Sequence, residues 1–205
     1  MQIKAVLFDF GGVLCFHPDP ARIAQAAEDC GVEYEPFLRA LWKNRIIYDA
    51  GQDPGEYWRD VAAHVNKNFD DDLIARMIGH EIEFWSRYDE RVFAWIKVLR
   101  ASGIRTAILS NLPRPLGERL RETEGFLDHF DHVTFSYELG MVKPQREIYE
   151  DAVRGTRVEP WEALFLDDRP ENIEGAIEAG LKAELYSTWE DFAEIPARYG
   201  LPPIR

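Results

Sequence analysis

The short run Ile3–Phe8 constrains the fold of this 205-residue chain more than any other segment. It is nearly continuous in apolar and β-branched residues, a pattern typical of a strand buried on both faces of a parallel sheet. Asp9 follows the run directly, so its side chain is expected at the carboxyl end of that strand. Gly11 and Gly12 then allow the backbone to turn sharply and to approach a ligand. A carboxylate at this place can be a nucleophile, a metal ligand or an ordinary turn residue.

Apolar strand segments alternate with amphipathic helices from residue 90 onward. Further strands are predicted at 105–110, 132–136, 163–167 and 183–186. Helices are predicted before Gly103 and at 114–124, 145–154 and 170–179. This alternation predicts an α/β fold with a doubly wound, mostly parallel sheet and a Rossmann-like core.

The stretch between the first two strands has a different character. It is rich in helical patterns and has little strand signal, with helices predicted at 21–30, 34–42, 54–65 and 71–85. We therefore expect residues 1–16 and 89–205 to form the core domain. Residues 17–88 would form an inserted α-helical cap over the carboxyl edge of the sheet, where open α/β sheets bind ligands.

Composition narrows the classes of partner and location. The net charge of −13 disfavours nucleic acids and anionic membrane surfaces as partners. No apolar run approaches the roughly 20 residues that span a bilayer, and no leader pattern precedes the first strand, so a cytoplasmic location is expected. Cys15 and Cys30 lack the spacing of a disulfide framework or a zinc site. No pattern specifies an oligomeric state.

Polar residues follow the predicted strand ends at four places. These segments are Asp9, Ser110-Asn111, Lys143-Pro144 and Asp167-Asp168. Each alone has an ordinary interpretation as a turn, a helix cap or a solvated side chain. Together they supply a nucleophile, hydrogen-bond donors, a cation and oxygen ligands for Mg²⁺, which are the requirements of phosphoryl transfer.

The order of these segments resembles the haloacid dehalogenase (HAD) superfamily, subclass I. All four motifs of that superfamily are present, as Asp9-Phe10-Gly11-Gly12-Val13, Leu109-Ser110-Asn111, Gly140-Met141-Val142-Lys143-Pro144 and Phe165-Leu166-Asp167-Asp168. The stretches 136–144 and 167–173 are similar to bacterial sugar phosphatases of the α-glucose-1-phosphatase type. They are also similar to the amino-terminal phosphatase domain of epoxide hydrolases. The resemblance implies an Mg²⁺-dependent phosphatase that acts on small phosphate esters, with sugar phosphates as the expected substrates.

The resemblance also implies a role for each motif residue. Asp9 would be the nucleophile that forms an aspartyl-phosphate. Ser110 and the backbone of Asn111 would hold the phosphoryl oxygens. Lys143 would orient Asp9 and offset the charge of the phosphate. The implied Mg²⁺ ligands are Asp9, the backbone carbonyl oxygen of Gly11, Asp167 and Asp168, a set of oxygens that suits this ion.

One position departs from the usual pattern of the superfamily. Most of its phosphatases have a second Asp two residues after the nucleophile as general acid and base, and this chain has Gly11 there. General acid–base help is typically worth about 10²–10⁴-fold, so a good leaving group would suffer least from its absence. The resembling sugar-phosphatase branch is similar in having glycine at this position. His17 is a candidate replacement proton donor.

Two alternative functions remain open at this point. Dehalogenases of the superfamily also lack the second Asp, because a halide leaves without a proton. They need no Mg²⁺ and usually lack an adjacent acidic pair, so Asp167-Asp168 favours a phosphatase. The second alternative is a catalytically weak phosphate-binding or regulatory protein. The presence of both Asp9 and Lys143 argues against it.

The cap and the loops at the sheet edge are expected to contact the substrate. The candidates are His17, Arg22, Arg45, Tyr48, Arg114 and Arg169. Arg45 and Arg114 are predicted to bind substrate together with Ser110, Asn111 and Lys143. Trp42, Trp58 and Trp85 are expected in the core of the cap rather than against a substrate.

Overall fold

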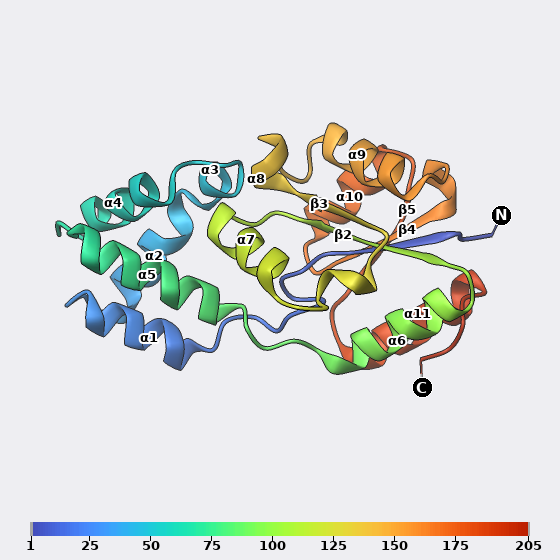
Figure 1. Cartoon of the computed structure of the whole chain (residues 1–205), viewed down its shortest axis with the longest axis horizontal. Helices are drawn as coiled ribbons and strands as arrows, with labels where there is room; N and C mark the ends of the chain where they lie inside the picture. Colours follow the sequence, from blue (N-terminus) through green and yellow to red (C-terminus); the bar gives the residue numbers. More distant parts are fainter. Residues whose placement is uncertain (1, 205) are drawn as a thin grey trace.

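The computed structural model describes residues 2–204 and contains one parallel sheet (Figure 1). Its strands are β1 (Ala5–Phe8), β2 (Arg105–Ser110), β3 (His132–Phe135), β4 (Ala163–Asp167) and β5 (Lys182–Leu185). The strand order is β3-β2-β1-β4-β5, and every pair is parallel. β1 is central, with Phe8 opposite both Ile108 and Leu166. The predicted doubly wound α/β fold is confirmed.

Helices cover both faces of the sheet. The first face is covered by α6 (Glu90–Ala101), α7 (Arg114–Glu122) and α11 (Trp189–Tyr199). The second face is covered by α9 (Arg146–Thr156) and α10 (Pro170–Glu178). Because side chains alternate along a strand, Val6 and Phe8 enter the first apolar cluster, and Ala5 and Leu7 enter the second. Burial on both sides explains the nearly continuous apolar run of β1.

A separate group of helices lies beside the sheet, at the left of Figure 1. It contains α1 (Pro20–Asp29), α2 (Tyr34–Lys43), α3 (Arg45–Asp49), α4 (Pro54–His64) and α5 (Asp71–Phe84), and we call it the cap. These helices pack around an apolar cluster of their own. Asp19, Asp53 and Asp70 cap α1, α4 and α5 by accepting hydrogen bonds from backbone N–H groups, which explains the sharp helix starts.

The two connections between cap and core run side by side. The N–H of Phe16 donates to the carbonyl oxygen of Arg87 at 2.9 Å, and the N–H of Asp89 donates to Leu14 at the same distance. Cys15 and Tyr88 form an antiparallel bridge between them. The cap therefore joins the core through a short two-stranded ribbon next to the end of β1.

Three helices differ from the sequence prediction. α3 and α8 (Ser136–Leu139) were not predicted, because four or five residues show no helical period. α11 was also not predicted, since Pro196 interrupts its pattern. Tertiary packing stabilises α11, where Phe192 packs edge-on against Trp95 with ring centroids 5.2 Å apart.

Two further observations concern the sequence predictions. Cys15 and Cys30 are both buried and free. Within residues 2–204, no helix has the length and apolar character needed to cross a bilayer.

Candidate active site

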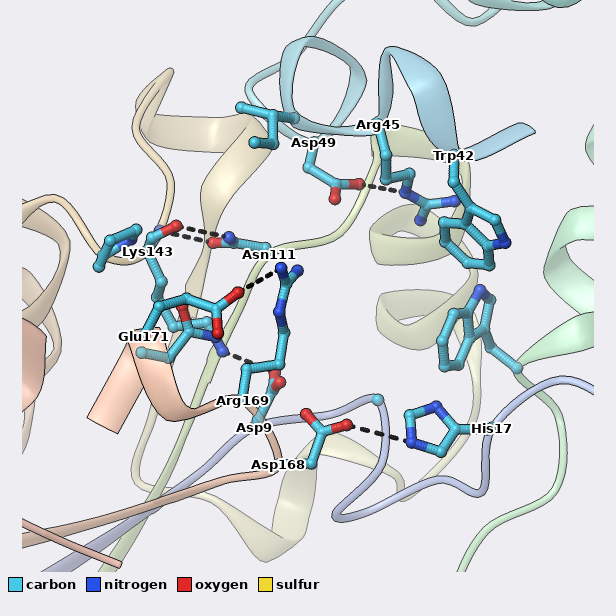
Figure 2. Close-up of a pocket in the computed structure, with 15 residues that line it drawn as sticks. Asp9, His17, Trp42, Arg45, Asp49, Asn111, Lys143, Asp168, Arg169 and Glu171 are labelled. Atoms are coloured by element: carbon cyan, nitrogen blue, oxygen red, sulfur yellow. Dashed lines mark hydrogen bonds and ion pairs between the residues drawn. The ribbon is translucent and has the colours of Figure 1, made fainter. Parts of the chain in front are cut away.

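The four predicted motif segments meet at the carboxyl edge of the sheet, and Figure 2 shows Asp9, Asn111, Lys143 and Asp168 from them. Asp9 comes one residue after β1, Ser110 ends β2 and Asp167 ends β4. Parallel strands direct these ends to the same edge, so residues far apart in sequence become neighbours. Asp9, Asp167 and Asp168 each place one carboxylate oxygen within 4.8 Å of the others.

Asp9 is buried and held through one of its two oxygens. Its Oδ1 accepts hydrogen bonds from Ser110 Oγ at 2.6 Å and from the N–H of Phe10 at 2.7 Å. The Nζ of Lys143 lies 2.9 Å from the same oxygen. Within residues 2–204, no hydrogen bond reaches Oδ2, although Asp9 lines a pocket. This arrangement fixes the carboxyl group and leaves one oxygen available to a ligand.

Burial also perturbs the ionisation of Asp9. It raises the pKa of Asp9 to about 7, while the positive charge of Lys143 acts in the opposite direction. The negative charge of Asp167 raises this pKa further, and the hydrogen bond from Ser110 lowers it. A bound cation would favour the charged carboxylate at neutral pH.

Lys143 is buried between two carboxylates. Its Nζ lies 2.6 Å from Asp167 Oδ2 and 2.9 Å from Asp9 Oδ1. Burial alone would lower the pKa of Lys143, but the charges of Asp167 and Asp9 raise it, so the side chain stays an ammonium ion. Asn172 Nδ2 donates to both oxygens of Asp167, at 2.9 and 3.0 Å. Asp167 therefore positions Lys143 and has both oxygens already bonded to protein.

Asn111 holds the loop that carries Lys143. Its Nδ2 donates to the carbonyl oxygen of Lys143 at 3.0 Å, and its Oδ1 accepts from the Lys143 N–H at 2.8 Å. Both bonds are drawn in Figure 2. Because the side chain is used in this way, its backbone N–H is the group that Asn111 can offer to a ligand.

Asp168 is the more open member of the acidic pair. Its Oδ2 lies 3.1 Å from His17 Nε2, and this contact is the main reason why the pKa of His17 is raised. Gly12 has a left-handed backbone (φ +77°), and a Cβ there would lie 2.5 Å from Asp168 Oδ2. The glycine thus allows the turn after β1 to approach Asp168. The proton-donor role suggested for His17 stays a prediction.

The oxygen atoms at this site are suitable ligands for a metal ion. Asp9 and Asp168 offer clustered carboxylate oxygens, and Gly11 lines the same pocket. Hard oxygen ligands of this kind fit Mg²⁺ better than softer metals. Since Asp167 is engaged by Lys143 and Asn172, Asp168 is the better candidate for direct contact.

The pocket above these groups has a volume of about 520 Å³ and is bounded by both core and cap. The core contributes Asp9, Gly11, Asn111, Lys143, Pro144, Asp168, Arg169, Glu171 and Asn172. The cap and its connections contribute His17, Trp42, Arg45, Ile46, Asp49 and Trp85. The volume exceeds what a phosphate alone would fill, so the pocket has room beside the cap for a larger ligand.

Two of the residues predicted to contact substrate, Arg45 and Tyr48, are bonded to acidic side chains of the cap. Arg45 lines the pocket, but its guanidinium group is bonded to Asp49 Oδ1 at 2.8 Å and to Glu81 Oε1 at 2.7 Å. Tyr48 is fully buried and donates to Glu81 Oε2 at 2.8 Å. Arg45 and Tyr48 thus belong to a buried polar network of the cap.

The other three candidate arginines differ in whether they line the pocket. Arg169 lines the pocket and is paired with Glu171. Arg22 donates to the carbonyl oxygen of Glu83, and Arg114 lies over the ring of Tyr137 at 5.3 Å. Neither Arg22 nor Arg114 is among the described residues that line the pocket.

The expectation that the tryptophans lie in the core of the cap was right for Trp58, wrong for Trp42, and met only in part by Trp85. Trp58 is fully buried in the cap, as expected. Trp42 is 40% exposed and lines the pocket, because the buried face of α2 is made by Phe37 and Leu41. Trp85 packs against the apolar clusters of both cap and core, and also lines the pocket.

Trp85 explains the glycine two residues after Asp9. A Cβ at Gly11 would lie 2.8 Å from Trp85 Cζ3, well inside van der Waals contact. The indole therefore lies where a side chain at position 11 would begin. Sequence reasoning missed this role, because residues 11 and 85 are linked only by the fold.

Comparisons with known proteins agree with this geometry. Residues 3–180 match the haloacid dehalogenase-like hydrolase family. A D-ribitol-5-phosphate phosphatase of Bacteroides thetaiotaomicron is 38% identical over 194 residues, covering 88% of this chain and 90% of the relative. A sesquiterpene phosphatase of Aspergillus oryzae is 32% identical over 185 residues, covering 87% of each chain.

Solved structures share the fold at lower identity. A HAD family enzyme of Bacteroides thetaiotaomicron, in complex with magnesium and inorganic phosphate, superposes with a TM-score of 0.73. The match has 21% identity and covers 95% of this chain and 99% of the other. An L-2-haloacid dehalogenase of Xanthobacter autotrophicus, covering 98% of this chain and 85% of its own, gives a TM-score of 0.71 at 20% identity. With its fold, its four motif segments and the match over residues 3–180, the chain belongs to the haloacid dehalogenase-like hydrolase family.

Proposed function

We propose that this protein is an Mg²⁺-dependent phosphatase that hydrolyses small phosphate monoesters through an aspartyl-phosphate. The observation that supports the proposal is how the two carboxylate oxygens of Asp9 are bonded. One oxygen is fixed by Ser110 and Lys143, the other accepts no hydrogen bond from residues 2–204, and Asp9 lines the pocket. A fixed carboxylate with one open oxygen suits in-line attack on phosphorus.

In the proposed reaction, Asp9 Oδ2 attacks phosphorus while the bond from phosphorus to the ester oxygen breaks. The ester oxygen takes a proton from water and leaves as the alcohol. A second water molecule then attacks phosphorus and loses a proton while the bond from phosphorus to Asp9 breaks, which releases inorganic phosphate and restores the carboxylate. Lys143 and Ser110 keep the carboxyl group in place and offset developing negative charge. Asp9, Asp168 and the carbonyl oxygen of Gly11 would hold Mg²⁺, whose positive charge would offset that of the phosphate.

Two comparisons support the metal and the substrate class. The relatives with 38% and 32% identity are both phosphatases, and the similar Bacteroides enzyme was solved with magnesium and phosphate. The carboxylates of Asp9 and Asp168 give this chain clustered oxygen ligands of the kind that such a site needs. Dehalogenation is the alternative reaction, because it too would use Asp9 as the nucleophile.

Phosphate release from para-nitrophenyl phosphate tests the proposal. We expect Mg²⁺-dependent turnover by the wild type and a loss of at least about 10³-fold in Asp9→Asn, which keeps the shape of the side chain. Thermal unfolding checks that the variant remains folded. Equal rates for the two proteins would refute the phosphatase. Chloride release from 2-chloropropionate without Mg²⁺ would favour the dehalogenase.

A further inference from the structure

We propose that the alcohol part of the substrate is uncharged and predominantly apolar, such as a long alkyl or isoprenyl chain, rather than a sugar or polyol. This inference rests on the proposed phosphatase function and specifies its substrate class. It follows from the cap side of the pocket, where the part of the ester away from phosphorus would lie.

The cap presents an apolar surface to the pocket. Trp42 and Ile46 line the pocket and are 40% and 66% exposed, although both are large apolar side chains. Trp85 adds a third apolar side chain to the lining. Apolar side chains left open at the mouth of a pocket are typical of a ligand-binding surface, because a ligand can cover them.

The position of this surface is also relevant. Figure 2 shows Trp42 on the side of the pocket opposite Lys143, with the side chains of Asn111 and Arg169 drawn between them. The guanidinium group of Arg45 lies over the Trp42 ring at 5.5 Å and supports it. A phosphoryl group held beside Asp9 and Lys143 would therefore direct its ester chain toward a supported indole ring.

The charges in the pocket also bear on the substrate. Among residues 2–204, each Lys or Arg side chain that lines the pocket is already paired with a carboxylate. Lys143 is bonded to Asp9 and Asp167, Arg45 to Asp49 and Glu81, and Arg169 to Glu171. A second phosphate or a carboxylate on the substrate would lack an unpaired cation. Arg45 and Asp49 in the cap lining are bonded to each other through Asp49 Oδ1, so the cation of Arg45 is already offset by a carboxylate.

A series of n-alkyl monophosphates from ethyl to octyl tests the inference. All members leave as primary alcohols, so the chemistry stays constant while apolar area grows. We expect kcat/KM to rise by about twofold to fourfold per methylene until the chain fills the pocket. D-ribitol 5-phosphate, also the ester of a primary alcohol, should be at least about tenfold poorer than octyl phosphate. Inhibition by n-alkylphosphonates should strengthen in parallel and provides a readout that needs no turnover of the alkyl series.

Two neighbouring residues of α3 provide a matched pair of variants. Ile46→Ser should reduce the ratio of octyl to ethyl kcat/KM by about threefold to tenfold, because Ile46 lines the pocket. Ile47 is 60% exposed but is not among the described lining residues, so Ile47→Ser should keep the ratio. Trp42→Ala should reduce the ratio as Ile46→Ser does.

The outcomes separate the two proposals. A flat alkyl series, a preference for D-ribitol 5-phosphate, or equal effects of Ile46→Ser and Ile47→Ser would overturn the apolar substrate. In those cases, Asp9-dependent hydrolysis of para-nitrophenyl phosphate would leave the phosphatase function intact. If no ester is hydrolysed in an Asp9-dependent way, the proposed function fails, and the substrate class fails with it.

Discussion

Replacing Gly11 with Asp restores the carboxylate that is usual at this position in the superfamily, and the structure predicts that the change is harmful. The backbone of Gly11 is not in the left-handed region, so the obstacle is spatial. The new Cβ would lie 2.8 Å from Cζ3 and 3.2 Å from Cη2 of Trp85. Trp85 would have to move, and it packs against the apolar clusters of both core and cap.

The size of the effect follows from the cost of overpacking. Forcing extra atoms into a packed site destabilises a protein by about 1–3 kcal/mol. Trp85→Ala removes the obstructing ring, so Gly11→Asp should cost less in that background. We expect the double variant to be more stable than the sum of the single effects by about 1–3 kcal/mol.

Urea unfolding of the four proteins measures this coupling, and kinetics measure its consequence. Gly11→Asp alone should lower kcat/KM on both octyl phosphate and para-nitrophenyl phosphate, because the displaced indole lines the pocket. In the Trp85→Ala background the new carboxylate can supply a proton, and this should favour the poorer leaving group, octyl phosphate. Additive stabilities within about 0.5 kcal/mol would refute the proposed contact. A single variant that gains activity without losing stability would refute it as well.

Three further predictions concern the ionic groups. Mg²⁺ should raise the unfolding temperature of the wild type by linkage, and Asp168→Asn should lose this shift in a thermal scan; an unchanged shift would contradict the ligand assignment. Lys143→Met leaves the buried carboxylates of Asp9 and Asp167 without their cation. It should lower the free energy of unfolding in urea by about 3–5 kcal/mol, and an unchanged urea midpoint would contradict this expectation. Arg45→Met should cost about as much, whereas Arg39→Met at an exposed pair should cost under about 0.5 kcal/mol. Burial raises the pKa of Glu81 and the charge of Arg45 lowers it, so Arg45→Met should raise this pKa further. The cost of Arg45→Met in free energy of unfolding should therefore grow as the pH rises above the ordinary pKa range of a Glu carboxyl, and a constant or falling cost would contradict this.

The sheet and the acidic edge were largely predictable from the sequence. The strands β2 and β4 occupy the predicted residues 105–110 and 163–167, because burial on both faces demands nearly continuous apolar runs. Asp9, Ser110 and Asp167 follow from the same pattern, since parallel strands end at one edge. Short elements such as α3 were not predictable, because they have too few residues to show a period.

The substrate side of the pocket could not be predicted in the same way. Trp42 is a large apolar residue of the kind that usually lies in a core. Only the packing of α2 shows that it lines the pocket. Arg45 looks like a free cation in the sequence, but the fold pairs it with Glu81, which lies 36 residues further along the chain. Interactions of this kind depend on how helices meet, and no local pattern specifies that.

The α/β core and the order of the residues around Asp9 could be predicted from the sequence alone, because strand periodicity and strand ends are local properties. The reason for the glycine at position 11 could not, because it depends on a contact made only in the folded chain. Only the folded chain brings Trp85 to 2.8 Å from the place of a Cβ at that position, through the ribbon that connects core and cap. The glycine makes room for an indole ring because close packing excludes two groups from the same space.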